Sequence, residues 1–189
     1  MNSYYQETFD ATNWKEIQFG QAEFEDCEFM GIDFDSTSLE RINFVECRFI
    51  ECNLSNVSFY ESILNDVSFE KCKMLGILFH KANKFILTLR FEGCVLSHSI
   101  FTGISLKKTK FLECELKEVD FSECDLTDAD FSNSDLFGAI FEKCLLAKTD
   151  FRSAQNYQIN LSNNTIQKPK FNRLNLVGLL AEYPLDITD

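Results

Sequence analysis

Large apolar residues recur at every fifth position along most of the chain. The stretch VDFSECDLTDADFSNSDLFGAIF, residues 119 to 141, places them at Phe121, Leu126, Phe131, Leu136 and Phe141. An α-helix turns by about 100° per residue and a straight strand alternates its faces, so neither brings residues five apart to one side. The spacing predicts a backbone that bends every five residues and keeps all of these side chains inside.

The same register covers nearly the whole sequence. It runs from Phe9 to Phe79, slips by two residues before Ile86 and continues to Phe151. After a break at Asn156, it resumes as Leu161, Ile166, Phe171 and Leu176. Of the twenty phenylalanines, only Phe85 and Phe137 lie off the register. A regularity of this extent is an internal repeat, and it decides the fold.

A second inward position lies two residues before each large one, and it holds small or β-branched residues. All eight cysteines occupy it, in pairs that are 20 residues apart: Cys27 and Cys47, Cys52 and Cys72, Cys94 and Cys114, Cys124 and Cys144. The gap from Cys72 to Cys94 is 22 residues, which matches the slip before Ile86. Four five-residue sides per coil explain both spacings. We expect reduced core thiols, because stacked coils would make their side chains parallel.

The segments CDLTD (124 to 128), ADFSN (129 to 133), SDLFG (134 to 138) and TDFRS (149 to 153) are close to the consensus A(D/N)LXX. In these motifs the chain resembles the pentapeptide-repeat family. The resemblance implies an all-β fold, a right-handed quadrilateral β-helix, here of about eight coils with about 4.8 Å per coil. It extends to members that protect type II topoisomerases from quinolones and to microcin-immunity proteins.

One β-helix is expected over residues 1–171, with a small bulge at 80–85 and an irregular wall at 153–169. Tyr157 is the candidate to replace the large residue missing at Asn156. Residues 172–189 predict a short helix, ended by Pro184, that either caps the last coil or forms a two-fold dimer, as the resemblance implies. The candidate dimer residues are Leu176, Leu179, Leu180, Tyr183, Leu185 and Ile187.

The formal net charge is −12, and it is unevenly distributed. One acidic block spans Glu23 to Glu51, and a basic patch holds Lys107, Lys108 and Lys110. The candidate partner-binding surface is a second block with one lysine among nine acids: Glu113, Glu115, Glu118, Asp120, Glu123, Asp125, Asp128, Asp130 and Asp135. A charged coat for solubility explains the acids equally well. A continuous stripe along one wall would favour mimicry of DNA, whereas a ring around one coil would favour solubility.

Catalytic motifs are missing from the sequence. The two histidines, His80 and His98, fall at outward positions of different repeats, and no zinc-protease, nucleophile-elbow or phosphate-loop pattern occurs. A convex rod also leaves its carboxylates unshielded, so their pKa values have little cause to shift. We expect no enzymatic activity, no cofactor and no metal.

The first residues lack the pattern of a secretory signal, and no stretch is long and apolar enough to span a membrane, so the expected compartment is the cytoplasm. The resemblance implies a homodimer whose acidic walls bind DNA gyrase or topoisomerase IV, with no direct contact to nucleic acid or membrane. The alternative is an adaptor rod that binds an unrelated protein through its end or through a loop at His80, Lys81, Lys84 and Phe85.

Overall fold

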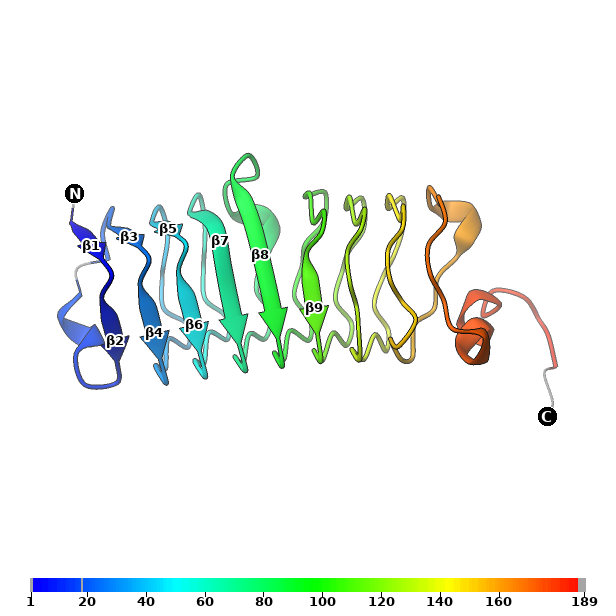
Figure 1. Cartoon of the computed structure of the whole chain (residues 1–189), viewed down its shortest axis with the longest axis horizontal. Coiled ribbons are helices and arrows are strands. Elements are labelled where there is room, and N and C mark those ends of the chain that lie inside the picture. Colours follow the sequence, from blue (N-terminus) through cyan, green and yellow to red (C-terminus); the bar gives the residue numbers. More distant parts are fainter. Residues whose placement is uncertain (1, 18, 187–189) are drawn as a thin grey trace.

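A computed structural model describes residues 2–17 and 19–186 and shows a β-solenoid that advances along one long axis (Figure 1). Its elements in order are β1 Ser3–Tyr5, β2 Thr8–Asp10, η1 Trp14–Glu16, β3 Glu23–Glu25, β4 Glu28–Met30, β5 Asn43–Val45, β6 Arg48–Ile50, β7 Ile63–Glu70, η2 Phe79–Lys81, β8 Leu87–Glu92, β9 Lys110–Leu112, η3 Leu161–Asn163 and η4 Arg173–Leu179. The strands are parallel in the order β1-β3-β5-β7-β6-β4-β2, and β8 and β9 continue from β7. The predicted all-β solenoid is confirmed.

The register of the strands confirms 20 residues per coil. Phe24 pairs with Phe44, whereas Phe69 pairs with Phe91 across the predicted two-residue insertion. Isolated bridges carry the 20-residue offset onward as far as the pair of Asp150 and Lys170. The insertion therefore lies in a loop, and the coils on either side of it stack normally.

The interior consists of columns of large side chains, one column per wall. We number the walls by their central residues: first, Phe24 and Phe44; second, Phe29 and Phe49; third, Phe34 and Leu54; fourth, Leu39 and Phe59. The second wall stacks nine phenylalanine rings from Phe9 to Phe171, with ring centroids 4.6 to 5.3 Å apart. Stacked rings of the fourth wall meet this column edge to face, for example Phe121 against Phe111 at 5.5 Å.

The small inward position also supplies hydrogen-bond donors. The thiols of Cys47, Cys52, Cys72 and Cys94 each donate to the carbonyl of a phenylalanine in the preceding coil, with an Sγ to O distance of 3.3 Å. Serine does the same where Ser134 donates to the Phe111 carbonyl at 2.8 Å. All eight cysteines are free and buried. A cysteine here fills space and partners a backbone oxygen.

The sequence places these thiols in four pairs, but in the structure two of the pairs stack in the same column. Because the insertion lies between Cys72 and Cys94, the pairs Cys52–Cys72 and Cys94–Cys114 form one column of four, as the bridges of the residues that follow them show. Burial raises the pKa of Cys47 and of Cys144 to about 12.

Three expectations about inward residues are wrong. Ile86 is 44% exposed, and Leu87 packs against the core in its place. Ile166 and Leu176 are also exposed, because they lie at the end of the solenoid, where no further coil covers them. Tyr157, in contrast, is buried as predicted, while Asn156 turns outward with φ of 57°. The regular part is therefore shorter than about eight coils.

The C-terminal segment differs from its prediction. Its helix is a 3-10 helix, Arg173–Leu179, that ends before Leu180 instead of at Pro184. Among residues 2–17 and 19–186, no helix has the length and apolar character that crossing a bilayer requires.

Candidate partner-binding surfaces

The acidic block from Glu113 to Asp135 forms a ring around slightly more than one coil. Bridges connect Glu115 to Asp135 on the third wall, while Asp120, Asp125 and Asp130 fall on the fourth, first and second walls. The remaining members, Glu113, Glu118, Glu123 and Asp128, are exposed at successive corners, each with positive φ. The nine residues are thus brought together as a belt and not as a stripe along one wall.

Four acids of this ring hold the backbone of their own corners. The carboxylate of each accepts a hydrogen bond from the backbone N–H two residues later, at 2.8 to 3.1 Å: Asp120 from Ser122, Asp125 from Thr127, Asp130 from Ser132 and Asp135 from Phe137. These side chains form the turns that end each wall. Their charge has a structural use before any partner is considered.

Lysines form ion pairs with part of the ring. Lys107 lies 3.1 Å from Asp125, Lys117 lies 2.9 Å from Glu115, and Lys143 lies 3.4 Å from Glu123. The hydrogen bonds from Lys117 and then Ser97 hold the pKa of Glu115 below its usual value. The ring therefore stays acidic, but many of its carboxylates hold turns or form ion pairs, which agrees with the solubility interpretation.

The excess negative charge lies instead in the first coils. Residues 1–70 contain fifteen acidic residues against three basic ones, which gives −12, and residues 71–189 contain fifteen of each. The first 70 residues form about three and a half coils, or about 17 Å at about 4.8 Å per coil. Duplex DNA carries one charge per about 1.7 Å, so this part of the rod reaches the charge density of DNA.

Some of these acids, on the first wall and at the corner after it, have no cation beside them. What we call the acidic face lies along β3 and at the corner that follows β3, β5 and the start of β7 (Figure 1). Its members form no ion pair within the described residues: Glu23, Glu25, Asp26, Glu46 and Asp66. Asp26, Glu46 and Asp66 stack at one corner because they are 20 residues apart. Sequence reasoning found the block from Glu23 to Glu51 but not this alignment, although the 20-residue spacing could have shown it.

The insertion loop projects from the rod between β7 and β8 (Figure 1). Phe85 is 97% exposed, and Lys81 and Lys84 are exposed beside it. His80 departs from its predicted outward position, because it is only partly exposed and its Nδ1 is buried with no hydrogen-bond partner among the described residues. His98 does lie outward, 3.3 Å from Glu118.

The C-terminal segment packs on the irregular wall through one face. Leu179 contacts the core, and the Gly178 carbonyl accepts a hydrogen bond from Ile159 N–H at 3.1 Å. A Cβ at Gly178 would collide with the Tyr157 carbonyl, so only glycine permits this approach. The other face is exposed at Leu176, Leu180, Tyr183 and Leu185, together with Leu174 and Val177. Ile187 lies outside the described residues.

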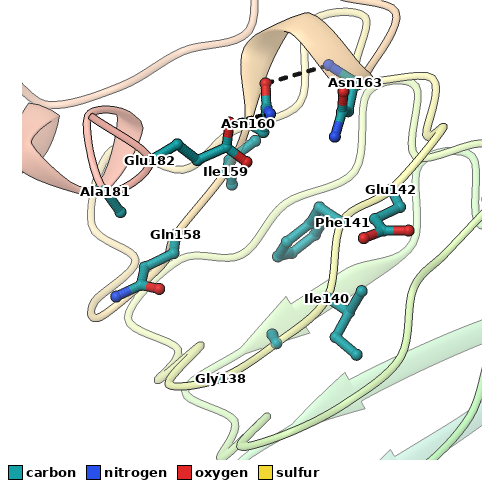
Figure 2. Close-up of a pocket in the computed structure, with 12 residues that line it drawn as sticks. Gly138, Ile140, Phe141, Glu142, Gln158, Ile159, Asn160, Asn163, Ala181 and Glu182 are labelled. Carbon is teal, nitrogen blue, oxygen red and sulfur yellow. Dashed lines mark hydrogen bonds between the residues drawn. The ribbon is translucent and has the colours of Figure 1, made fainter. Parts of the chain in front are cut away.

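A cavity of about 310 Å³ separates this segment from the last regular wall (Figure 2). Figure 2 shows Glu142 on the wall side and Glu182 on the segment side, where the Glu182 carboxylate meets the Asn160 amide. Asn163 N–H donates to Asn160 Oδ1 at 3.3 Å. Ile140, Phe141 and Ile159 line the cavity together with these amides and carboxylates. In the part of the chain described, no three metal-ligating side chains gather anywhere.

Comparisons with known proteins agree with this architecture. A family model described as "Pentapeptide repeat region" matches residues 42–121, and another described as "Pentapeptide repeats (8 copies)" matches residues 114–152. A search of curated proteins finds no match.

Two solved structures are similar in fold. A trypsin-treated form of QnrB1, a plasmid-mediated fluoroquinolone resistance protein, has a TM-score of 0.59 at 18% identity, covering 100% of this chain and 92% of that one. HetL, a pentapeptide repeat protein involved in heterocyst differentiation regulation in Nostoc sp. strain PCC 7120, has a TM-score of 0.50 at 12% identity, covering 85% and 91%. At such identities the similarity concerns the fold alone.

Proposed function

Because this chain belongs to the pentapeptide-repeat family and shares its fold with a fluoroquinolone resistance protein, we propose that it is a non-enzymatic rod that binds DNA gyrase or topoisomerase IV. The binding surface in this proposal is the acidic face of the first coils. The ring from Glu113 to Asp135, which the sequence favours, is the less suitable surface, since six of its nine acids hold turns or face lysines: Asp120, Asp125, Asp130, Asp135, Glu115 and Glu123.

The observation that carries the proposal is the local charge density. A surface that binds duplex DNA presents cations to a phosphate array, and a rod of similar linear charge can occupy the same surface. The acidic face supplies carboxylates without cation partners on a rigid sheet, so ordering them on binding requires little loss of backbone entropy. By occupying the DNA site, the rod would modulate the enzyme or protect it from quinolones or peptide toxins.

Matched charge variants test this assignment. One variant removes four charges from the acidic face (Glu25→Gln, Asp26→Asn, Glu46→Gln, Asp66→Asn), and its control removes four from the ring corners (Glu113→Gln, Glu118→Gln, Glu123→Gln, Asp128→Asn). Supercoiling by purified gyrase is measured with and without a quinolone. We expect the first variant to need about tenfold more protein for the same inhibition or protection, and the control to behave as wild type.

Failure has two distinguishable forms. If wild-type protein in excess neither inhibits nor protects and no salt-sensitive complex forms, gyrase is not the partner. If both variants lose activity equally, a topoisomerase is the partner but the acidic face is not its site.

For the C-terminal segment we propose a two-fold dimer through its exposed apolar side chains. The inner side of the segment caps its own coil through Leu179, which leaves Leu174, Val177 and Leu185 free for the same patch of a second copy. Sedimentation at micromolar concentration measures this, with Val177→Glu expected to give monomers. A monomeric wild-type protein would contradict the dimer, and the segment would then serve only as a cap on the last coil.

A further inference from the structure

Phe85 is exposed to a degree that no other phenylalanine of the described chain approaches. Its side chain is 97% exposed, against 59% for Phe137, while the repeat phenylalanines are buried or pack against the core. Ile86 beside it is 44% exposed. The Asn83 side chain accepts a hydrogen bond from Phe85 N–H at 3.0 Å, so the tip of the loop has a defined conformation.

The tip of the loop makes no contribution to the hydrogen bonds between coils. Asn83 N–H donates to the Ser62 carbonyl and Lys81 accepts from Glu61 N–H, so the ladder closes before Lys84 and resumes at Leu87. Phe85 itself contributes nothing to the core. Holding an apolar ring in water on an ordered loop has no structural explanation in the solenoid.

The loop lies in a basic band that interrupts an acidic protein. Residues 71–112 contain eight lysines and arginines and one acid, Glu92. Three of the eight form ion pairs, and the others form none within the described residues: Lys73, Lys81, Lys84, Lys108 and Lys110. Lys84 reaches across the next coil, with its Nζ near Gly103. Of these five, Lys81 and Lys84 flank the exposed ring, whereas Lys73, Lys108 and Lys110 lie on or beside other walls of the same coils.

A shallow groove of about 350 Å³ adjoins the loop on the fourth wall. Tyr60 and Leu78, 40% and 44% exposed, line it together with Lys81, which belongs to the loop itself. Glu40, Asn56 and Ser58 also line the groove, and Lys81 connects it to the loop that carries Lys84 and Phe85. Contiguous apolar surface with a charged rim is typical of a protein interface.

We propose that this surface docks an acidic protein partner, with Phe85 inserting into an apolar pocket that carboxylates surround. Charge complementarity favours this occupant: the lysine rim attracts carboxylates, and a single aromatic residue at the centre is the usual anchor of such a contact. Nucleic acid and anionic lipid are disfavoured, because the acidic coils on one side and the acidic ring on the other would repel an extended phosphate surface. The inference is independent of the proposed binding to a topoisomerase, which uses the acidic face.

The test uses a phage-displayed library of random peptides, panned on the immobilised full chain with excess soluble Phe85→Ala protein as competitor. We expect enriched peptides that combine Asp or Glu with a cluster of large apolar residues. A selected peptide is then synthesised, and its binding is measured by fluorescence anisotropy. Phe85→Ala should weaken binding about tenfold or more, and Lys81→Glu with Lys84→Glu should weaken it and flatten its salt dependence.

Phe137→Ala is the matched control, since it removes the other exposed phenylalanine, and its binding should equal that of wild type. Circular dichroism should show unchanged melting for Phe85→Ala, because the ring touches no core residue. The proposal is overturned if no peptide family is enriched, if selected peptides bind Phe85→Ala as well as wild type, or if Phe137→Ala has the same effect. Phe85-dependent self-association at low salt, or Phe85-dependent binding to phosphatidylserine vesicles, would also overturn it by identifying a different occupant.

Discussion

The first coils, residues 19–70, and the later coils, residues 94–155, follow the same five-residue repeat but finish their corners differently. In the first coils the corner between the first and second walls lies between paired strands such as β3 and β4, whereas turn bonds close the corners after the third and fourth walls, for example Val57 N–H to the Leu54 carbonyl at 3.1 Å. In the later coils backbone turn bonds close the corners, for example Ala129 N–H to the Leu126 carbonyl at 3.0 Å. Aspartates there cap the same turns.

This difference decides which acids are available. In the later coils aspartate is part of the turn, so its oxygens are engaged locally, and Asp125 also pairs with Lys107. In the first coils Asp33 caps a turn and Glu28, Glu51, Glu61 and Glu70 form ion pairs, but the side chains of Glu25, Glu46 and Asp66 hold no turn and form no ion pair among the described residues, so their charge remains free for a partner. Equal numbers of acids on two stretches of one repeat therefore do not mean equal surfaces.

The largest expected difference concerns the core. Phe44→Ala should destabilise the fold by about 3–5 kcal/mol, because the ring packs on Phe24, Phe49 and Phe59 and leaves a cavity. Leu126→Ala, at the same position of a later coil, removes a smaller side chain and should lose about 2–4 kcal/mol. Urea unfolding of both variants measures this. Equal losses below about 1 kcal/mol would contradict close packing of the columns.

The next difference concerns the acids. Asp130→Ala should lose about 1–2 kcal/mol, because the Ser132 N–H and hydroxyl lose their acceptor. Glu25→Ala should stay within about 0.5 kcal/mol of wild type, since its carboxylate has no partner among the described residues. Thermal unfolding of the pair checks the distinction. If Asp130→Ala does not change stability, the turn needs no cap, and the carboxylates of the ring are as available to a partner as those of the acidic face.

A pH dependence sharpens the same point. The bonds from Arg152, at 2.7 Å, and from Lys170 lower the pKa of Asp150 from 3.8 to about 2. Because the pKa of Asp150 is lower in the folded protein, the ionised carboxylate stabilises the fold above its ordinary value of 3.8. This stabilisation is lost as the pH falls toward about 2. Asp150→Asn should therefore be less stable than wild type near neutral pH, by on the order of 1 kcal/mol, and equal to it near the lower limit. A difference that persists unchanged in acid would exclude this ion pair as its cause.

The smallest effect tests the thiol donors. Cys47→Val keeps a buried small residue of a kind found at this position, such as Val67, but removes the donor to the Phe24 carbonyl. We expect a loss of about 1 kcal/mol. The control is Val119→Cys, in a later coil, which should be close to neutral. If Cys47→Val is neutral as well, the thiol acts only through its volume.

Much of the fold follows from the sequence because every repeat places its large residue inward in the same way. The five-residue period places the columns, the 22-residue gap between Cys72 and Cys94 places the loop, and the missing large residue at Asn156 points to Tyr157. Periodicity could not show that Leu87 packs inward in place of Ile86. It fixes the phase of the repeat on each side of an insertion, but not the residue at which the phase changes.

The candidate surface was harder to predict, because charge counts do not distinguish a carboxylate that caps a turn from one that is free. The residues do carry a signal. Asp120, Asp125 and Asp130 each precede a large inward residue and are followed two positions later by Ser or Thr, a pattern typical of a capped turn. Glu25, Asp26 and Asp66 follow a large residue instead and have no such use.

Carboxylate footprinting tests the central claim most directly. Full-length protein, free and mixed with purified gyrase, is labelled with a carbodiimide and glycine ethyl ester, and mass spectrometry measures the modification of each acid. The proposed arrangement predicts that Glu25, Asp26, Glu46 and Asp66 lose labelling in the complex while Glu113, Glu118, Glu123 and Asp128 keep it. Protection confined to the second group, or labelling that gyrase leaves unchanged at every acid, would contradict it.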